Sequence, residues 1–213
     1  MQFTRLAAVF SFFVAACHAA ALTRSSARCS GARAVSTEMI GAVNFTTFAC
    51  PEAPPVDLKA AAASISKRDT SPVPGTSIAN VPRQFQNCAG GASDPECECA
   101  VLCGSLSFCT GSEAVAPAQS DCQTIDNELS TVAGSFFVEA NMGVSFTFQS
   151  CEAVWINEAG RELEYCFENF GQLTSVSYTN CVIVDGGGQG GCIADDFNWF
   201  FEFLIPGNTI IVP

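Results

Sequence analysis

The sequence predicts an α+β fold, a disulfide-rich two-layer sandwich in which two helices cover one face of an antiparallel sheet. Three observations lead to this prediction. Thirteen cysteines in 213 residues are far above ordinary usage. Short stretches of alternating apolar residues, typical of strands, are interleaved with two stretches of helical spacing. Their order is helix, two strands, helix, two strands, which suits helices packed on one face of an antiparallel sheet.

The dibasic pair Lys67-Arg68 separates two parts of opposite charge. Seven of the nine Lys and Arg lie at or before residue 68, whereas 18 of the 21 acidic residues follow it, so residues 1–68 carry a net +4 and residues 69–213 a net −16. Such asymmetry indicates that the two parts have different roles. The pair resembles a site cut by kexin-type proteases of the secretory pathway. The alternative is an ordinary exposed Lys-Arg in a linker.

Four segments are therefore predicted. Residues 1–21 have the positive start, short apolar run and small-residue end of a secretory signal peptide. Residues 22–68 are expected to be a propeptide or flexible leader with a glycosylation sequon at Asn44. Residues 69–87 are expected to be a linker, and residues 88–213 a cysteine-rich globular domain. No stretch is long and apolar enough for a transmembrane helix, so no membrane insertion is expected.

The cysteines predict a disulfide framework. Cys17 lies in the apolar leader, and Cys29 and Cys50 precede the dibasic pair. The other ten are expected to form five bridges: Cys88, Cys97, Cys99, Cys103, Cys109, Cys122, Cys151, Cys166, Cys181 and Cys192. Both sub-counts are even, as pairing within each part requires. The spacing from Cys97 to Cys109 also permits a zinc site, but an oxidising compartment favours disulfides, so no metal is expected.

The first helix is predicted over residues 120–134. Ser120 and Gln123 form a capping-box pattern, and Gly134 is a natural stop. Apolar residues recur at helical spacing and define one buried face: Cys122, Ile125, Leu129 and Val132.

Strands are predicted over residues 135–140 and 144–157. Val144, Phe146 and Phe148 alternate with polar residues, so one face is expected to be buried and the other to be wet. A short strand is also possible near Val101.

A second helix is predicted over residues 161–178, although Gly171 and a β-favouring stretch weaken its second half. The glycine run 186–191 lacks the Lys-Ser/Thr ending of a phosphate-binding loop and is interpreted as a turn held near cysteines. Residues 198–205 are predicted to form a strand that pairs back with residues 209–212 as a hairpin.

Missing residue types exclude several chemistries. His18 is the only histidine and lies in the signal, and residues 69–213 contain no lysine. Ser-His-Asp and Cys-His catalysis, histidine-ligated metals and Schiff-base chemistry are therefore excluded for the processed domain, and no cofactor is expected. Its strong negative charge disfavours binding to nucleic acid. Hydrolysis by paired carboxylates remains open, with these candidates: Glu152, Glu158, Glu162, Glu164, Glu168, Asp195, Asp196 and Glu202.

Two places combine an aromatic ring with acid and amide groups, as carbohydrate-binding sites do. Trp155 is followed by Asn157 and Glu158, and Trp199 is preceded by three polar residues: Asp195, Asp196 and Asn198. These seven residues are the candidate ligand-binding residues. The alternative is that both tryptophans belong to the core.

The chain resembles small secreted cysteine-rich proteins of filamentous fungi. More narrowly, Ser120 to Ile125, Gly134 to Val138 and Phe148 to Cys151 are similar to the fungal necrosis-inducing effector domain related to killer toxins. The similarity covers roughly residues 118–152. It implies an α/β sandwich with a secreted, non-enzymatic role toward other cells, and it supplies no catalytic residue.

We therefore expect a secreted, disulfide-stabilised binding or effector-like protein that acts outside the cell. Its expected partner is a cell-wall glycan or an extracellular protein on another organism's surface. The alternative is a secreted carboxylate-dependent glycoside hydrolase.

Overall fold

The computed structural model describes residues 29, 31–50, 88, 96–101, 103 and 106–208. The predicted signal peptide, the Lys67-Arg68 pair, the linker 69–87 and the strand 209–212 lie outside the described residues. Processing at these positions therefore stays a prediction.

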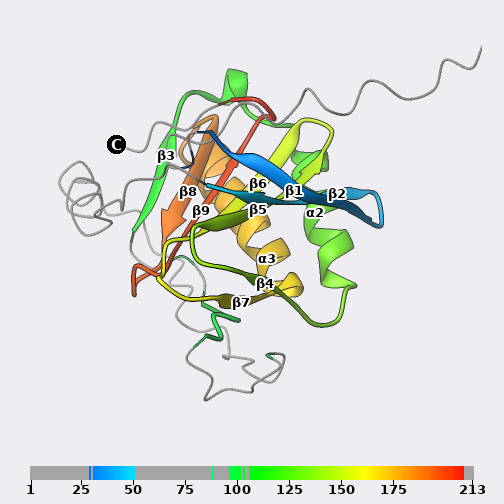
Figure 1. Cartoon of the computed structure of the whole chain (residues 1–213). Coiled ribbons are helices and arrows are strands. Elements are labelled where there is room, and N and C mark those ends of the chain that lie inside the picture. The colour runs from blue at the N-terminus through cyan, green and yellow to red at the C-terminus, as the bar shows by residue number, and fades with distance from the viewer. Residues whose placement is uncertain are drawn as a thin grey trace, which may run out of the picture.

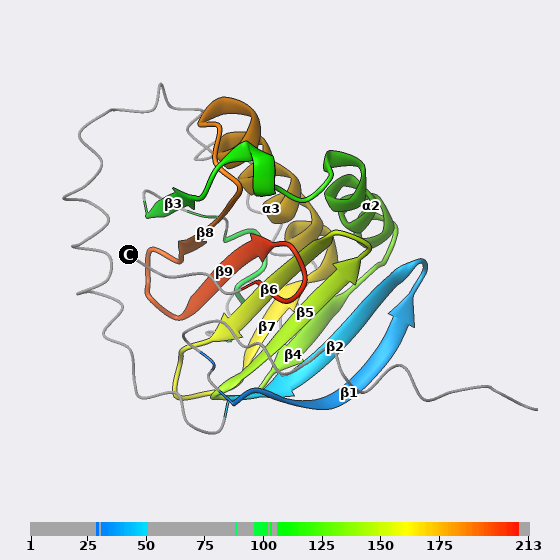
Figure 2. The same cartoon turned by 90° about the horizontal axis from the view of Figure 1, so that it is seen from above.

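The main element is a seven-stranded sheet in the order β1-β2-β5-β6-β9-β8-β3, and each neighbouring pair is antiparallel (Figures 1 and 2). In chain order its strands are β1 (Arg33–Ile40), β2 (Val43–Ala49), β3 (Ser107–Thr110), β5 (Met142–Phe148), β6 (Cys151–Asn157), β8 (Gln189–Ile193) and β9 (Trp199–Leu204). A second sheet pairs β4 (Ser135–Val138) with β7 (Leu163–Cys166).

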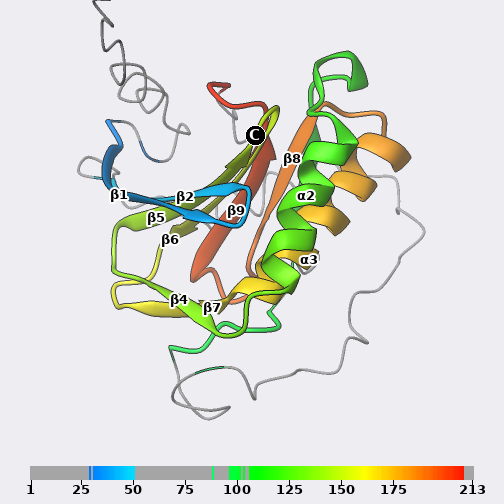
Figure 3. The ribbon, with the colours of Figure 1, turned by 90° about the vertical axis from the view of Figure 1, so that its right-hand side faces the viewer.

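Two helices, α2 (Gln119–Ser130) and α3 (Phe167–Tyr178), lie side by side on one face of the large sheet (Figure 3). The predicted fold class, a disulfide-rich α+β sandwich with two helices on one face, is confirmed. No helix in the described part of the chain is long and apolar enough to cross a bilayer.

Helix α2 forms where it was predicted, but it begins differently and ends earlier, at Ser130, so that Val132 and the predicted stop Gly134 lie beyond its end. Cys122, Ile125 and Leu129 are buried on one face, as the helical spacing indicated. The capping box was wrong: Ala118 is the N-cap, and the Ser120 hydroxyl donates to Asp121 Oδ1 instead. The carboxylate of Asp121 then accepts from the backbone and hydroxyl of Ser150, so the start of the helix is fixed by the β5–β6 turn.

The second predicted helix was wrong in its first part. Residues 163–166 form strand β7, and α3 begins only at Phe167. These residues form a strand despite their helical spacing because hydrogen-bonded neighbours lie along both edges of the strand. Residues 135–138 pair along one edge, and backbone bonds link Glu164 to Glu96 and Glu98 along the other. After α3 a π-helical turn, Thr179–Val184, carries Cys181 to its disulfide partner Cys109.

The predicted strand 144–157 is a hairpin of β5 and β6 that turns at Gln149 and Ser150. Val144 and Phe146 face the helices in the main core, together with Trp199, Phe201 and Phe203 of β9. The expectation of a wet opposite face was wrong at Ser145, which is buried. That face carries a second apolar cluster formed by residues from several strands, including Phe48, Phe108, Val154, Ile156, Phe200 and Leu204.

The predicted leader contributes two strands to the sheet. β1 and β2 form a hairpin that is closed by the Cys29–Cys50 disulfide, and β2 pairs with β5 along six residues. Val43 and Phe45 lie in the main core and Phe48 in the second cluster. Within residues 22–68, the segment 31–50 is thus part of the folded sheet.

The glycine run ends as a strand rather than as a loop. Gly190 and Gly191 lie in β8, which pairs with both β3 and β9. A Cβ on Gly190 would lie 2.2 Å from Cys181 Sγ, and one on Gly191 would lie 2.1 Å from the Phe201 carbonyl oxygen. The glycines are required because the Cys109–Cys181 disulfide and strand β9 pack directly against this backbone.

Six disulfides connect the twelve described cysteines, as the even sub-counts predicted. Cys29–Cys50 lies within the N-terminal hairpin. The other five are Cys88–Cys97, Cys99–Cys166, Cys103–Cys192, Cys109–Cys181 and Cys122–Cys151. The cysteines between residues 97 and 109 reach four different partners rather than one another. Six disulfides fit a small extracellular, disulfide-stabilised protein.

Candidate functional site

The two predicted acid–aromatic sites meet at one end of the large sheet. Asn157, the last residue of β6, pairs in register with Trp199, the first residue of β9. Next to this pair, the Glu158 N–H donates to the Asn198 carbonyl oxygen at 2.9 Å. Residues that are about forty positions apart in the sequence therefore form one region.

The tryptophans of this region lie in the core. Trp155 and Trp199 are each 0 % exposed, and their rings stack on each other with centroids 5.8 Å apart. A sugar needs a ring face open to solvent, so neither ring can serve as the aromatic platform that the sequence suggested. Both tryptophans are therefore core residues, which was the alternative interpretation of the sequence.

Asn157 is also an internal residue. Its Nδ2 donates to the carbonyl oxygens of Val138 at 2.7 Å and Arg161 at 2.8 Å, and its Oδ1 accepts from the Ala159 N–H at 2.8 Å. These three bonds occupy the amide and fix the turn that follows β6. Asn157 therefore shapes the region, and at 1 % exposure it is not accessible to a ligand.

Glu98, a residue that the sequence analysis did not select, completes the site. Asn198 Nδ2 donates to Glu98 Oε1 at 3.0 Å and to Asp196 Oδ2 at 2.8 Å. The Asn198 N–H also donates to Asp196 Oδ1 at 3.0 Å. We call Glu98, Asp196 and Asn198 the acid–amide cluster.

A backbone hydrogen bond and the disulfides of both neighbouring residues fix the position of Glu98. Its N–H donates to the Glu164 carbonyl oxygen at 2.8 Å, and its neighbours Cys97 and Cys99 are held in disulfides with Cys88 and Cys166. Glu98 is 3 % exposed, Asn198 is half-buried and Asp196 is exposed. The cluster thus runs from a buried carboxyl group to the surface. The sequence offered one signal for Glu98, a charged residue between two cysteines.

The pKa of Glu98 is raised from 4.5 to about 7, first by burial and second by the nearby charge of Asp196. The hydrogen bond from Asn198 acts in the opposite direction. The Trp199 indole also lowers this pKa, by less than Asn198 does. Near neutral pH, Glu98 therefore exchanges between a proton donor and an acceptor.

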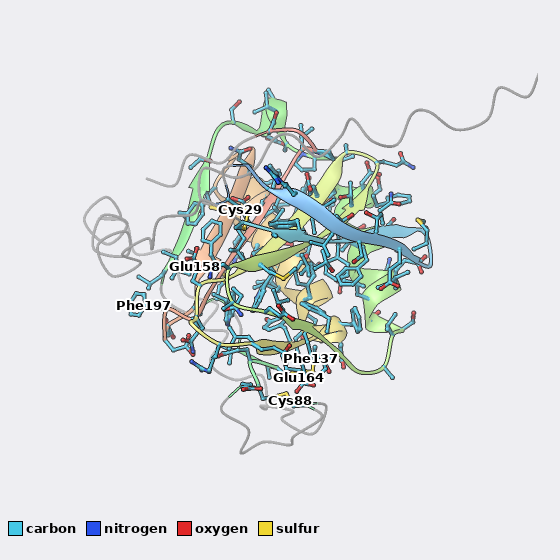
Figure 4. The ribbon with its side chains drawn as sticks, viewed as in Figure 1. Cys29, Cys88, Phe137, Glu158, Glu164 and Phe197 are labelled. Atoms are coloured by element: carbon cyan, nitrogen blue, oxygen red, sulfur yellow. A yellow bond between two sulfur atoms is a disulfide. The ribbon has the colours of Figure 1, made fainter. Side chains whose placement is uncertain are left out.

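One aromatic residue next to the cluster in the sequence is not fully buried, and it packs against the second apolar cluster. Phe197 is half-buried and lies between Asp196 and Asn198 in the sequence. Its backbone has φ 64°, a left-handed conformation that is rare for a bulky residue, and its N–H donates to the Ala194 carbonyl oxygen at 2.9 Å. Figure 4 shows Phe197 and Glu158 at the same margin of the molecule. Asp195 is exposed, and Glu158 is half-buried.

The other candidate carboxylates are spread over several elements of the fold. Glu152 lies in β6, where burial raises its pKa and Ser145 donates to it. Glu164 is buried and accepts from the Ser135 hydroxyl. Glu202 is buried in β9, Glu162 is exposed, and Glu168 is in the first turn of α3.

Three sulfur atoms near Glu98 have the spacing of metal ligands. The Sγ atoms of Cys88, Cys99 and Cys166 lie within 4.8 Å of one another. Each sulfur already belongs to a disulfide, Cys88–Cys97 or Cys99–Cys166. Zinc needs thiolates, so this group is a pair of stacked disulfides that supports the Glu98 backbone.

Neither known family models nor curated proteins give a match to this chain.

Proposed function

We propose that the protein is a secreted binding protein that acts outside the cell and takes a hydroxyl-bearing ligand, such as a cell-wall glycan, at the acid–amide cluster. Six disulfides suit the extracellular space, because cross-links limit unfolding where no chaperone acts. The absence of histidine and lysine from residues 69–213 makes contact a simpler role than reaction.

The bridge that Asn198 makes between Glu98 and Asp196 carries the proposal. It holds a buried carboxyl group, an exposed carboxyl group and a half-buried amide together in fixed positions. Carboxylate and amide oxygens accept hydrogen bonds from sugar hydroxyls, and the protonated form of Glu98 can donate one. Phe197, which lies between Asp196 and Asn198 in the sequence, adds a half-buried aromatic side chain, whereas both tryptophans are fully buried.

An effector-like role toward another organism is the more specific form of this proposal. It is supported by the resemblance of residues 118–152 to the necrosis-inducing effector domain and by the predicted secretory signal. In this form the ligand would belong to the surface of the other organism.

Glycoside hydrolysis is the second candidate, because Glu98 has the raised pKa of a general acid and lies next to Asp196. The position of Asn198 favours binding instead. Its amide nitrogen lies between the two carboxyl groups and bonds to both, and in a glycosidase the scissile bond would occupy that space.

Titration with defined wall glycans tests the proposal. Chitin and β-glucan oligosaccharides are added to the secreted protein while tryptophan fluorescence is followed, because Trp199 directly follows the cluster in the sequence. Asn198→Ala and Phe197→Ala should each weaken binding by about tenfold or more, which corresponds to the loss of one good contact. Glu139→Gln, an exposed acid outside the cluster, is the matched control.

Equal affinities in the cluster variants and the control would contradict this site, and so would the absence of binding to every glycan tested. The same samples distinguish hydrolysis. Release of shorter glycans that is lost in Glu98→Gln would make the protein a glycosidase.

A further inference from the structure

Within the residues that the structure describes, no disulfide joins the N-terminal hairpin to the rest of the fold. Its only described disulfide, Cys29–Cys50, closes the hairpin on itself. The five other disulfides connect cysteines between residues 88 and 192. Among the twelve described cysteines, none bridges the two parts.

The surface that receives the hairpin is the edge of β5. Six residue pairs join β2 to β5 in register, from Asn44↔Thr147 to Ala49↔Met142. The Cys50 N–H then donates to the Asn141 carbonyl oxygen at 3.0 Å. Figure 2 shows β2 between β1 and β5 as a regular member of the sheet. The backbone groups of β5 on this edge are satisfied by residues 44–49.

Aromatic side chains of the hairpin also pack against β5. The Phe45 ring stacks on Phe146 with centroids 4.7 Å apart and lies 6.0 Å from Phe136. Phe48 packs on the opposite face, where a Cβ on Gly143 would lie 2.5 Å from its ring. The glycine leaves space for that ring. The β5 edge therefore fits this hairpin on both of its faces.

The hairpin is also organised before it docks. β1 and β2 pair along most of their length, Thr37 and Thr46 join their hydroxyls at 3.2 Å, and the disulfide closes the open end. A preorganised strand loses little conformational freedom when it binds, so a covalent link is not needed to keep it in place.

We propose that residues 29–50 are a non-covalent subunit of the mature protein. When the chain is cut after Arg68, the hairpin stays on the β5 edge, and the secreted protein consists of two chains that no disulfide joins. The small chain ends at Arg68, and the large chain starts at Asp69. Loss of the hairpin would uncover Phe146 and the β5 backbone, both of which the fold buries.

A glycan gives the small chain a label. Asn44 of the sequon lies in β2 with its side chain exposed, while its neighbours Val43 and Phe45 are buried. A glycan added there would remain on the mature protein, whereas removal of a propeptide would take it away.

The experiment uses the full chain secreted from a host with a kexin-type protease, and Arg68→Ala as the uncut control. Native mass spectrometry of the purified protein should give the summed mass of both chains. Denaturing, non-reducing conditions should separate them into a glycosylated small chain and a large chain. A large chain alone under native conditions would overturn the proposal. A single uncut chain, both from the medium and after added kexin-type protease, would also overturn it.

Two neighbouring substitutions test the docking surface. Phe45→Ser removes the ring that packs on Phe146 and should release the small chain from the cut protein. Asn44→Gln changes the adjacent exposed side chain and should leave both chains together. Release in both variants, or in neither, would contradict docking through Phe45. Where Phe45→Ser is not secreted, dilution of the cut wild-type protein provides the measurement, and a small chain that dissociates at micromolar concentration contradicts the proposal.

Discussion

At the scale of single residues, Glu98 has an unusual environment for a carboxyl group. It combines 3 % exposure, an exposed acid nearby and a single amide donor that it shares with that acid. A carboxyl group placed in this way keeps its proton to higher pH than an exposed one does. Ionising Glu98 costs more free energy in the folded protein than in the unfolded chain. The stability of the fold therefore depends on whether Glu98 is protonated.

The pH dependence of stability should show this coupling. The folded-state pKa of Glu98 is about 7, above the ordinary value of 4.5, so the folded protein binds more protons than the unfolded chain between these values. The contribution of Glu98 is then fully present below pH 4.5 and is lost as the pH rises through about 7. Thermal melts should give a Tm that falls from about pH 5 to pH 8.

Glu98→Gln should flatten that fall, because glutamine does not titrate. A smaller slope should remain, since burial also raises the pKa values of Asp126 and Glu152. Glu139→Gln, in an exposed position, should keep the full slope. A Tm that rises over this range, or a slope unchanged in Glu98→Gln, would contradict the assigned environment.

Ser150 is the second residue with a specific expected effect. Its N–H and hydroxyl both donate to Asp121 Oδ2, at 3.0 and 2.5 Å, and its oxygen accepts from the Ala118 N–H at 2.9 Å. These bonds hold the pKa of Asp121 below its usual value. Ser150→Ala should lower the free energy of unfolding by about 1–2 kcal/mol in urea at pH 7. Ser130→Ala, which loses one exposed bond at the end of α2, should cost less.

The sequence identified much of the site region but not its geometry. Asp196, Asn198 and Trp199 were selected as an acid, amide and aromatic combination, and the structure places them together. Which aromatic ring is accessible depends on how β6 and β9 pack against the helices, and local sequence does not encode that. Glu98 was missed because it is about a hundred positions from Asn198 and meets it only through tertiary contacts.

At the scale of elements, strand β8 shows how close packing against a backbone can require glycine at a given position. Its two adjacent glycines lie where the Cys109–Cys181 disulfide and strand β9 leave no room for a side chain. The sequence analysis interpreted them as part of a turn because glycines are common there. Strand pairing on both sides of β8 explains why they form a strand.

Gly190→Ala should therefore disturb the adjacent disulfide. The new methyl group would lie 2.2 Å from Cys181 Sγ, so the π-helical turn must move or the bridge must fail. We expect a loss of more than about 2 kcal/mol in stability, as overpacking of this kind gives. Gly186→Ala has open space around its Cβ, so its effect should come from its positive φ alone and be smaller. Equal effects in the two variants would contradict the packing argument.

Helix α2 could be predicted from sequence because Cys122, Ile125 and Leu129 follow one helical period over about two turns. Strand β7 could not, because Leu163 and Cys166 fit the helical spacing of α3 as well as a strand. The preference for a strand comes from β4 and from residues 96–98, which are remote in the chain. The same reason explains why β1 and β2 were missed: their place in the sheet depends on β5.

At the scale of the whole molecule, disulfides of different span should stabilise the fold unequally. Cys103–Cys192 joins residues 89 positions apart, whereas Cys88–Cys97 joins residues 9 apart. A longer loop loses more conformational freedom in the unfolded chain when it is closed. Replacing both cysteines by alanine should therefore cost about 2 kcal/mol more for Cys103–Cys192 than for Cys88–Cys97. Urea unfolding of the two double variants measures this, and the reverse order would contradict the entropic account.

The central claim at this scale is that residues 31–50 belong to the folded protein rather than to a leader that is lost. Hydrogen–deuterium exchange of the protein as it is secreted tests this most directly. If the hairpin is part of the sheet, the β2 amides bonded to β5 should be found in the secreted material and should exchange as slowly as those of β5 and β6. Rapid exchange across residues 43–49, or their absence from the secreted protein while β5 and β6 stay protected, would contradict the account.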